Sequence, residues 1–485
     1  MRILSKALLT TLMLSVPVSM AACSNDDDPS TGDGDGGGGG DGDGDGDGDG
    51  DGDGDGDGDG DGDGDGDGDG DGDGGAGGMG GMPGDGDGDG DGDGDEPPFT
   101  ADECLDEDGP TTEVLGSGIG AFSDSDDWMA GWTNWSIDST PEDDGTNPTD
   151  IIETVDSDTT LTEGYWALDE EIHVTDGATL TIEPGVIIKA TADGSIVVER
   201  GSKIMAVGTV SKPIIMTSAV ENGSKAAGDW GGLIILGAAQ NYDGELLIEG
   251  LADEDENKHG GTEDDDDSGE LKYVRVEFSG TEISPGNEIN GITFGSVGSG
   301  TDISYVQVNS TLDDGFEWFG GTLDADHLVV NNAGDDMFDG DKGFRGTLDT
   351  LFGRQVVPLS GDPNGYEMDG DDGDDKTVDV DTEIDTMSAT LCGNPAANIA
   401  YGAVLRESLF GSHEDVVFVG FDAAVDARDD FEGKITMTDS YSWENAEGVA
   451  YDEDQLGCDD APDCDDDGEF DEAAWFLDEE TNTEW

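Results

Sequence analysis

Short apolar bursts alternate with polar turns between residues 171 and 218. A glycine, proline or aspartate turn separates each burst from the next, and the bursts read IHV, TLTIE, VIIKA, SIVVE, KIMAVG and PIIMTS. None of them is long enough for an amphipathic helix. Further bursts of the same kind follow in WGGLIILG, KYVRVEFSG, NGITFG and ISYVQVN. The pattern predicts an all-β domain built from short strands.

An internal repeat organises these strands. Residues 305–309 (YVQVN) and 313–317 (DDGFE) align without gaps onto residues 327–331 (HLVVN) and 335–339 (DDMFD), and DDFE at 429–432 is a looser echo. Strand-and-turn repeats of this length, with few helical stretches, indicate a β-solenoid whose parallel rungs stack about 4.8 Å apart.

The alternation within the strands predicts which side chains fill the coil. IVV, VQV and LVV supply a narrow apolar interior, and the intervening positions face water. We expect Glu199, Arg275 and Gln307 at outward positions.

A solenoid must also cover the strand edges at its two ends. We expect residues 98–165 to wrap the N-terminal end, the coil to span residues 166–450, and the acidic tail 451–485 to finish the other end. The segment DWMAGWTNW contributes Trp128, Trp132 and Trp135 to the first of these. We expect them to form a capping core, with a sugar-stacking platform as the alternative.

Several longer stretches together resemble a known family. In chain order they are GWTNW, LTIEPGVIIKA, VVERGSKIMAVGT, PIIMTS, DWGGLIILG, KYVRVEFSG, NEINGITFGSVGSGT and DDGFEWFGGT. They are similar to secreted bacterial lipoproteins with a right-handed parallel β-helix of the pectin-lyase-like type. The resemblance covers most of residues 125–450 and implies a fold, but no particular reaction.

Residues 1–22 predict an export signal. Arg2 and Lys6 precede an apolar run that is too short to span a bilayer, and MAA stands immediately before Cys23. This arrangement resembles a lipobox, in which Cys23 receives acyl chains, and Ser24 after it favours the outer membrane. We expect a lipid-anchored protein exposed at the cell surface; an ordinary signal peptide with a spare thiol is the alternative.

Residues 23–97 form the next segment, which from Thr31 to Pro97 is nearly pure Asp-Gly, broken only by GAGGMGGMPG at residues 75–84. With no apolar side chain to bury and maximal backbone freedom, such a segment cannot offset its ordering entropy. We predict a disordered tether that lifts the domain from the membrane. A calcium-binding repeat of the RTX kind would need an apolar residue in each turn, and this repeat has none.

Acidity is not confined to the repeat. The chain has 121 Asp and Glu against 17 Lys and Arg, and the first 95 residues hold 28 of the aspartates and two of the bases, which leaves 93 acids against 15 bases beyond them. Such a chain repels nucleic acid and other anionic polymers and attracts cations.

Apart from Cys23, four cysteines remain in a chain that we expect to leave the reducing cytosol. Three pairings are possible. We favour Cys458 with Cys464, which close the short loop CDDAPDC, and therefore Cys104 with Cys392. The chain has no CxxC pair, so we expect neither a zinc site nor thiol redox chemistry.

The repeat also predicts an acidic ladder. If one repeat is one coil, the twin aspartates of one rung stack about 5 Å from those of the next, a repulsion that invites a cation or a shared proton. Oxygen ligands of this kind suit calcium. The candidate ligands are Asp313, Asp314, Glu317, Asp335, Asp336 and Asp339.

Solvated turns and a catalytic acid pair are the alternatives for this ladder. We interpret Lys342 and Arg345 as the only adjacent bases, with the role of neutralising it, and the run from Glu367 to Asp375 as solvated. In the tail, Asp463, Asp465, Asp467 and Asp471 are spaced as in the start of an EF-hand loop, although Ala474 stands where a glutamate is usual. An acidic loop held by the Cys458 to Cys464 bridge is the alternative there.

These features favour a calcium-stabilised surface protein that binds or adheres to an extracellular polymer, most simply a glycan, with no nucleic-acid partner. A polysaccharide-degrading lyase or hydrolase is the first alternative, and a structural surface component is the second. Of the N-T-D, D-D, G-H-G and R-I-K signatures of β-helix galacturonases, only D-D occurs here. The sequence therefore favours binding over catalysis.

Overall fold

The computed structural model describes residues 97–451, except for 124–126, 253, 285–286, 358–362, 371–377, 379, 395–399, 408, 429–433 and 446. Several predicted features lie outside the described residues and stay predictions: the signal peptide, Cys23, the tether, the Cys458 to Cys464 bridge, and the tail ligands Asp463, Asp465, Asp467 and Asp471. No helix in the described part of the chain has the length and apolar character needed to cross a membrane.

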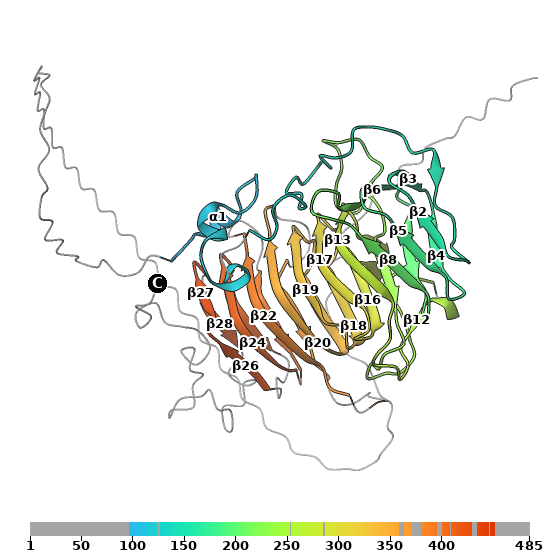
Figure 1. Cartoon of the computed structure of the whole chain (residues 1–485). Helices are drawn as coiled ribbons and strands as arrows, with labels where there is room; N and C mark the ends of the chain where they lie inside the picture. Colours follow the sequence, from blue (N-terminus) through green and yellow to red (C-terminus); the bar gives the residue numbers. More distant parts are fainter. Residues whose placement is uncertain are drawn as a thin grey trace, which may run out of the picture. The chain divides into compact units, whose positions relative to one another are not determined.

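The strands wind into a parallel β-helix, which confirms the predicted fold class (Figure 1). Sheet 1 contains β1 (Asp150–Ile151), β2 (Thr159–Leu161), β3 (Gly164–Leu168), β5 (Thr179–Ile182), β6 (Val186–Ala190), β8 (Lys203–Val207), β9 (Ile214–Ser218), β13 (Gly269–Glu277), β17 (Asp302–Asn309), β19 (Ala325–Asn331), the later part of β20 (Phe338–Arg354), β22 (Glu383–Cys392), β24 (Phe410–Val419), β26 (Lys434–Thr438) and β27 (Tyr441–Trp443).

Sheet 2 forms another side of the coil. It contains β4 (Glu171–Val174), β7 (Ser195–Val198), β10 (Leu233–Leu236), β16 (Ile292–Val297), β18 (Phe316–Gly321), the start of β20, β21 (Tyr366–Asp369), β23 (Tyr401–Arg406), β25 (Ala423–Arg428) and β28 (Glu447–Tyr451).

The remaining elements are short. Two antiparallel pairs lie outside the coil, β11 (Leu246–Leu247) with β12 (Lys258–His259) and β14 (Thr281–Ser284) with β15 (Asn287–Ile289). The helices are α1 (Ala101–Cys104), α2 (Thr112–Leu115), and the single 3₁₀ turns η1 (Gly120–Phe122) and η2 (Asp255–Asn257).

The strand register confirms the repeat found in the sequence. Val306 pairs with Leu328 in sheet 1, and Phe316 pairs with Phe338 in sheet 2. One repeat is therefore one complete coil. The coil begins at β1, earlier than the residue 166 that the sequence suggested, because β1 already pairs in parallel with β3.

Inward side chains form a continuous apolar core. Its middle is aromatic: the Phe316 and Phe338 rings stack with centroids 5.8 Å apart, and Trp318 stacks on Phe344 at 5.5 Å. The stack of Phe316 on Phe338 follows directly from the parallel register, in which these two residues pair, and burial of large rings on this scale stabilises the domain strongly.

Residues 99–145 correct the predicted N-terminal cap. This segment, called the strap below, lies along the outer side of sheet 1. At one end Trp443 Nε1 donates to the main-chain oxygen of Phe99 at 2.9 Å, and at the other Lys189 pairs with Asp143 at 2.9 Å. Because Trp443 belongs to β27 and Lys189 to β6, the strap crosses most of the rungs instead of covering one end.

The strap also corrects the expectation that outward side chains of sheet 1 face water. Gln307 exchanges two hydrogen bonds of 2.8 Å with the main chain of Asn134, and Arg275 donates to the main-chain oxygen of Trp132 at 3.1 Å. Outward apolar side chains, including Val329 and Phe352, are buried under the strap. They need this cover because a sheet face with exposed Phe and Val would be unfavourable in water.

Of the three tryptophans of the strap, Trp132 is buried as core, as expected, and Trp128 and Trp135 pack against that core partly buried; all three lie against the side of the coil. Trp132 contacts the Tyr305 ring edge to face at 6.2 Å, and Trp135 contacts Phe352 at 5.9 Å. Trp128 contacts Tyr305 at 6.5 Å. These contacts occupy the rings within the protein and disfavour a sugar-stacking platform.

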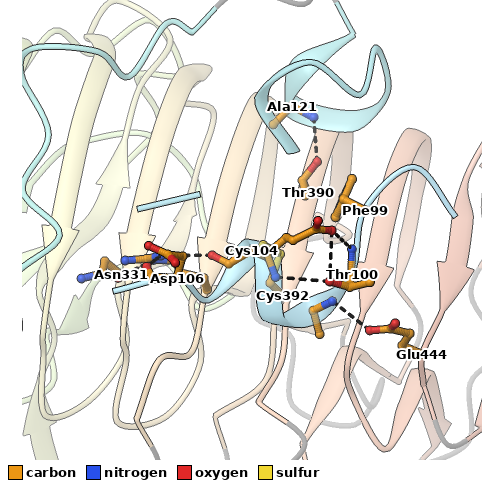
Figure 2. Close-up of a disulfide and its surroundings, with 12 residues drawn as sticks. Phe99, Thr100, Cys104, Asp106, Ala121, Asn331, Thr390, Cys392 and Glu444 are labelled. Carbon is orange, nitrogen blue, oxygen red and sulfur yellow. Dashed lines mark hydrogen bonds between the residues drawn. A yellow bond between two sulfur atoms is a disulfide. The ribbon is translucent and has the colours of Figure 1, made fainter. Parts of the chain in front are cut away.

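The disulfide between Cys104 and Cys392 confirms one predicted pairing. Figure 2 shows it fixing α1 of the strap to β22. Nearby, Ala121 N–H donates to Thr390 Oγ1 at 3.1 Å, and Glu444 accepts from Ala101 N–H at 2.8 Å (Figure 2). The bridge therefore lies within a set of polar contacts that fasten the same segment.

Candidate acidic site on sheet 2

The acidic ladder predicted from the repeat lies where the chain turns into sheet 2. Asp313 and Asp314 precede β18, and Asp335 and Asp336 precede β20 in the next coil. Within the strands, Glu317 pairs with Asp339, and Asp339 pairs with Glu367 of β21. Carboxylates of three successive rungs therefore stack in register.

One column of this turn is a polar ladder. Asn290, Asp314, Asp336 and Asn364 occupy equivalent positions in successive coils. Asp314 N–H donates to Asn290 Oδ1 at 3.3 Å, and Asp336 N–H donates to Asp314 Oδ1 at 2.8 Å. Each of these two acceptors thus satisfies a main-chain donor of the next rung, as a buried N–H requires.

Steric crowding explains why a glycine, Gly315, follows Asp314. A Cβ at Gly315 would lie 2.5 Å from the main-chain oxygen of Met337, closer than any real Cβ contact. The sequence DDG therefore combines an acceptor for the next rung with the close approach of two coils.

The ladder brings carboxylates into two groups of three. Oxygens of Asp313, Asp314 and Asp335 all lie within 4.8 Å of one another, and so do oxygens of Asp314, Glu317 and Asp339. We call the first group the rim triad and the second the inner triad; Asp314 belongs to both. Although Asp313 and Asp314 are sequence neighbours, both reach the rim triad because they lie in a turn, where the alternation of an extended strand does not apply.

Burial and mutual repulsion raise the pKa values of these acids. Asp336 is 3% exposed, Asp314 6% and Glu317 7%. Burial, followed by the charges of Asp339 and Glu317, raises the pKa of Asp314 well above its usual range. Burial also raises the pKa of Glu317, Asp336 and Asp339 well above theirs. The ionised forms of this group therefore need compensation from a cation or a proton.

Asp313 stands at the half-buried edge of the group. Burial, together with the charges of Glu288, Asp335 and Glu249, raises the pKa of Asp313 to about 7. Such a carboxyl exchanges protons near neutral pH, a property that general acids share.

Two oxygens of the group lack a hydrogen-bond partner. Among the described residues, Asp336 Oδ1 and Asp339 Oδ1 have essentially no exposed surface and accept no hydrogen bond. A buried carboxylate oxygen without a donor is unfavourable unless something else supplies positive charge.

The positive charges near the ladder differ from those expected. Arg406 of β23 pairs with Glu367 and with Asp369. Lys342 pairs with Asp341 at 2.6 Å, whereas Arg345 lies against Asp264 at 3.2 Å. The interpretation of Lys342 and Arg345 as the only adjacent bases was therefore wrong.

The interpretation of residues 367–375 as solvated was wrong at its start. Glu367 and Asp369 have side chains 16% and 18% exposed and join the acidic ladder through Arg406. Alternation in the short strand Tyr366–Asp369 was the signal, because Glu367 and Asp369 occupy the two outward positions. Nothing in the sequence indicated Glu249, which follows β11, or Glu288, which lies in β15; both elements lie outside the coil.

This arrangement can perform two kinds of chemistry. Carboxylate oxygens that converge within 4.8 Å can share a hard cation. A protonated carboxyl beside an ionised one can also act as an acid and base pair on a glycosidic bond.

Comparisons with known proteins concern the fold. The family model of a pectate-lyase-like β-helix domain matches residues 153–459. No curated protein matches the chain. Among solved structures, the chain is similar to the catalytic domain of a GH87 α-1,3-glucanase in complex with nigerose, with 13% identity, 65% of this chain and 67% of that chain covered, and a TM-score of 0.31. At this level the likeness says nothing about activity.

Proposed function

Because the chain belongs to the family of pectate-lyase-like β-helix domains, we propose that it acts on a polysaccharide, and that it does so as a glycoside hydrolase at the rim triad. The observation that carries this proposal is the convergence of Asp313, Asp314 and Asp335 within 4.8 Å at the half-buried edge of the ladder. Hydrolysis with retention uses two carboxyl groups about 5 Å apart, one as acid and one as nucleophile. Asp313 and Asp335 are the accessible pair.

The bases near the ladder favour hydrolysis over lyase chemistry. A lyase needs a neutral base to remove a proton from the sugar ring. Burial is the largest influence on Arg406 and lowers its pKa, but the hydrogen bond and charge of Asp369 and the charge of Glu367 together outweigh it and raise the pKa above the usual value. At Lys342 burial also acts to lower the pKa, and the charge and hydrogen bond of Asp341, together with Tyr242, outweigh it and raise the pKa. Both groups therefore stay protonated and engaged in ion pairs.

Charge also favours a neutral substrate. Beyond the first 95 residues the chain still has 93 acidic against 15 basic residues. A protein with this charge repels pectate and other polyanions unless cations intervene. A neutral glucan or mannan would meet no such barrier.

Binding without cleavage is the second candidate, and the burial of the ladder favours it. Asp314 and Glu317 are almost completely covered, so a sugar chain reaches only the rim. A surface adhesin that holds a glycan, anchored through acylated Cys23 in the outer membrane and raised on the Asp-Gly tether, would use the same face. This location is part of the proposal, and release of a Cys23→Ser variant from membranes would support it.

The decisive experiment incubates the mature protein with insoluble and soluble glycans, including α-1,3-glucan, mannan and pectate. New reducing ends from a neutral glycan, lost in Asp313→Asn and Asp335→Asn but retained in Asp302→Asn, are the expected result. Asp302 is an exposed aspartate of sheet 1 and serves as the matched control. Retention on a glycan column without products would support the adhesin instead, and unsaturated products from pectate would show a lyase.

A further inference from the structure

We propose that the inner triad, Asp314, Glu317 and Asp339, binds a divalent cation, and that this cation is calcium. The sequence spread its calcium prediction over the whole ladder and the tail; of the two groups of three converging carboxylates in the ladder, we assign the ion to the more buried one. The inference goes beyond the proposed function, because the ion would stabilise the fold whether or not a glycan is cleaved.

The distances fit the ion. Three oxygens no more than 4.8 Å apart leave a point within about 2.8 Å of all of them, close to the calcium to oxygen distance of about 2.4 Å. Small rotations of the three side chains would shorten these distances to the length of a calcium to oxygen bond. Magnesium requires shorter bonds of about 2.1 Å and a stricter octahedron, which makes it the poorer fit.

The unpartnered oxygens point to a ligand independently of the clustering. Asp339 Oδ1, within the inner triad, and Asp336 Oδ1, on the adjoining ladder position, are buried without a hydrogen-bond donor. Asp336 is 3% exposed, so water from the surface does not satisfy it. A cation held by the inner triad would supply the missing positive charge to Asp339 Oδ1, in place of the donor that a buried carboxylate otherwise needs.

The protein's own cations are directed elsewhere. No ion pair among the described residues joins a lysine or arginine to Asp314, Glu317 or Asp339. Arg406 is shared between Glu367 and Asp369, and Lys342 is held by Asp341. Within the described part of the chain, the inner triad therefore has three acids and no paired base.

Asp314 connects this site to the rim. It is a member of both triads, and its Oδ1 accepts from the Asp336 N–H, which fixes the carboxylate from the side of the next coil. An ion bound to Asp314 would restrict the motion of this carboxylate, and so would fix one of the three members of the rim triad. The alternative is that the carboxylates share protons and bind no metal.

Calcium alone is the probe. The full chain is stripped with a chelator, and calcium is then titrated in while binding heat and melting temperature are recorded. We expect saturable binding and a rise in melting temperature. Magnesium at the same concentration should give a clearly smaller rise.

Variants of the proposed ligands test whether the ion binds at the inner triad. Glu317→Gln and Asp339→Asn should weaken calcium binding at least tenfold, and in the metal-free state their melting temperatures should equal or exceed that of the wild type, because each removes one buried like charge. Glu414→Gln and Asp302→Asn make the same chemical changes on sheet 1, at exposed positions, and should leave the calcium response intact.

Several results would overturn the inference. The absence of binding heat and of any calcium-dependent change in the wild type would show that the carboxylates share protons. A calcium response that survives in both inner-triad variants would place the ion elsewhere, for instance on the acidic tail. If both variants unfold, the wild-type titration still decides. Glycan cleavage is not measured here, so calcium binding stands or falls separately from the hydrolase proposal.

Discussion

The carboxylate of Asp314 accepts a hydrogen bond of 2.8 Å from the main-chain N–H of Asp336, one coil later in the chain. The same position is an asparagine in the preceding coil, where Asn290 accepts from the Asp314 N–H at 3.3 Å. An amide therefore fills the structural role as well as a carboxylate does. Aspartate adds a negative charge at this position. Because an asparagine keeps the hydrogen-bond acceptor but lacks that charge, substitution can test the structural role and the proposed cation-binding role separately.

Asp314→Asn and Asp314→Ala should consequently differ. The asparagine keeps an acceptor for Asp336 N–H, so in a chelator its free energy of unfolding should be no lower than that of the wild type. The alanine leaves that buried donor unpaired and should lower the free energy of unfolding by about 1–3 kcal/mol. Urea denaturation without metal measures both, and an equal loss in the two variants would contradict the acceptor role.

The disulfide should stabilise the domain through the strap. Cys104 and Cys392 are 288 residues apart, so their bond restricts a very long loop in the unfolded chain. We expect Cys104→Ala with Cys392→Ala to lower the free energy of unfolding by about 3 kcal/mol. Reductant should lower the melting temperature of the wild type to that of the double variant, and a reduced wild type as stable as the oxidised one would refute the expectation.

His413 should make the domain sensitive to acid. It pairs with Met437 inside the coil, is 1% exposed, and neither ring nitrogen has a hydrogen-bond partner among the described residues. Burial lowers the pKa of His413 to about 4. Since the unfolded chain has a histidine pKa near 6.5, it takes up a proton that the folded chain refuses, and stability falls as pH drops from about 6.5 to about 4.

Replacing His413 with an apolar residue removes its contribution to the pH dependence of stability. Between pH 7 and pH 4.5, His413→Leu should lose about 2–3 kcal/mol less of its free energy of unfolding than the wild type does. His173 gives a control of opposite sign. Its hydrogen bond with Glu171 outweighs burial and raises its pKa, so His173→Gln should be destabilised more at low pH than at high pH. Parallel pH curves for the wild type and His413→Leu would contradict the prediction.

The coil was predictable because its repeats are local. Val306 and Leu328 have the same sequence separation as Phe316 and Phe338, and the parallel register preserves that spacing. The strap was not predictable, since alternation tells inside from outside within a strand but does not show what covers the outside. Phe352 is an outward apolar side chain that signals cover without identifying it.

The acidic ladder was only partly predictable for a related reason. Asp339 pairs with Glu367, and Glu367 pairs with Val404, across connections that are both longer than the repeat. These connections break the period, so alignment of the repeat stops before Glu367, Asp369 and Arg406. The charges of Glu249 and Glu288 reach Asp313 from the excursions that carry β11 and β15, whose positions are set by tertiary packing and not by the period.

The last prediction concerns Arg406, which supplies the positive charge opposite Glu367 and Asp369 at the end of the ladder. Its guanidinium pairs with both Glu367 and Asp369, and its side chain is 30% exposed. Removing one partner of a largely buried ion pair leaves uncompensated charge behind. We expect Arg406→Met to lower the free energy of unfolding by about 2–3 kcal/mol at pH 7 in a chelator.

The pH dependence of that loss distinguishes charge from packing. Burial raises the pKa values of Glu367 and Asp369 even with Arg406 present, and without it they should rise further. Acids with raised pKa values destabilise the fold above those values and cease to do so once protonated, so the difference from the wild type should shrink as pH falls from 7 to 5. Lys212→Met, which breaks an exposed pair with Glu163, should cost less than about 1 kcal/mol at either pH. A loss at Arg406 that stays constant with pH would mean that the side chain acts by packing alone.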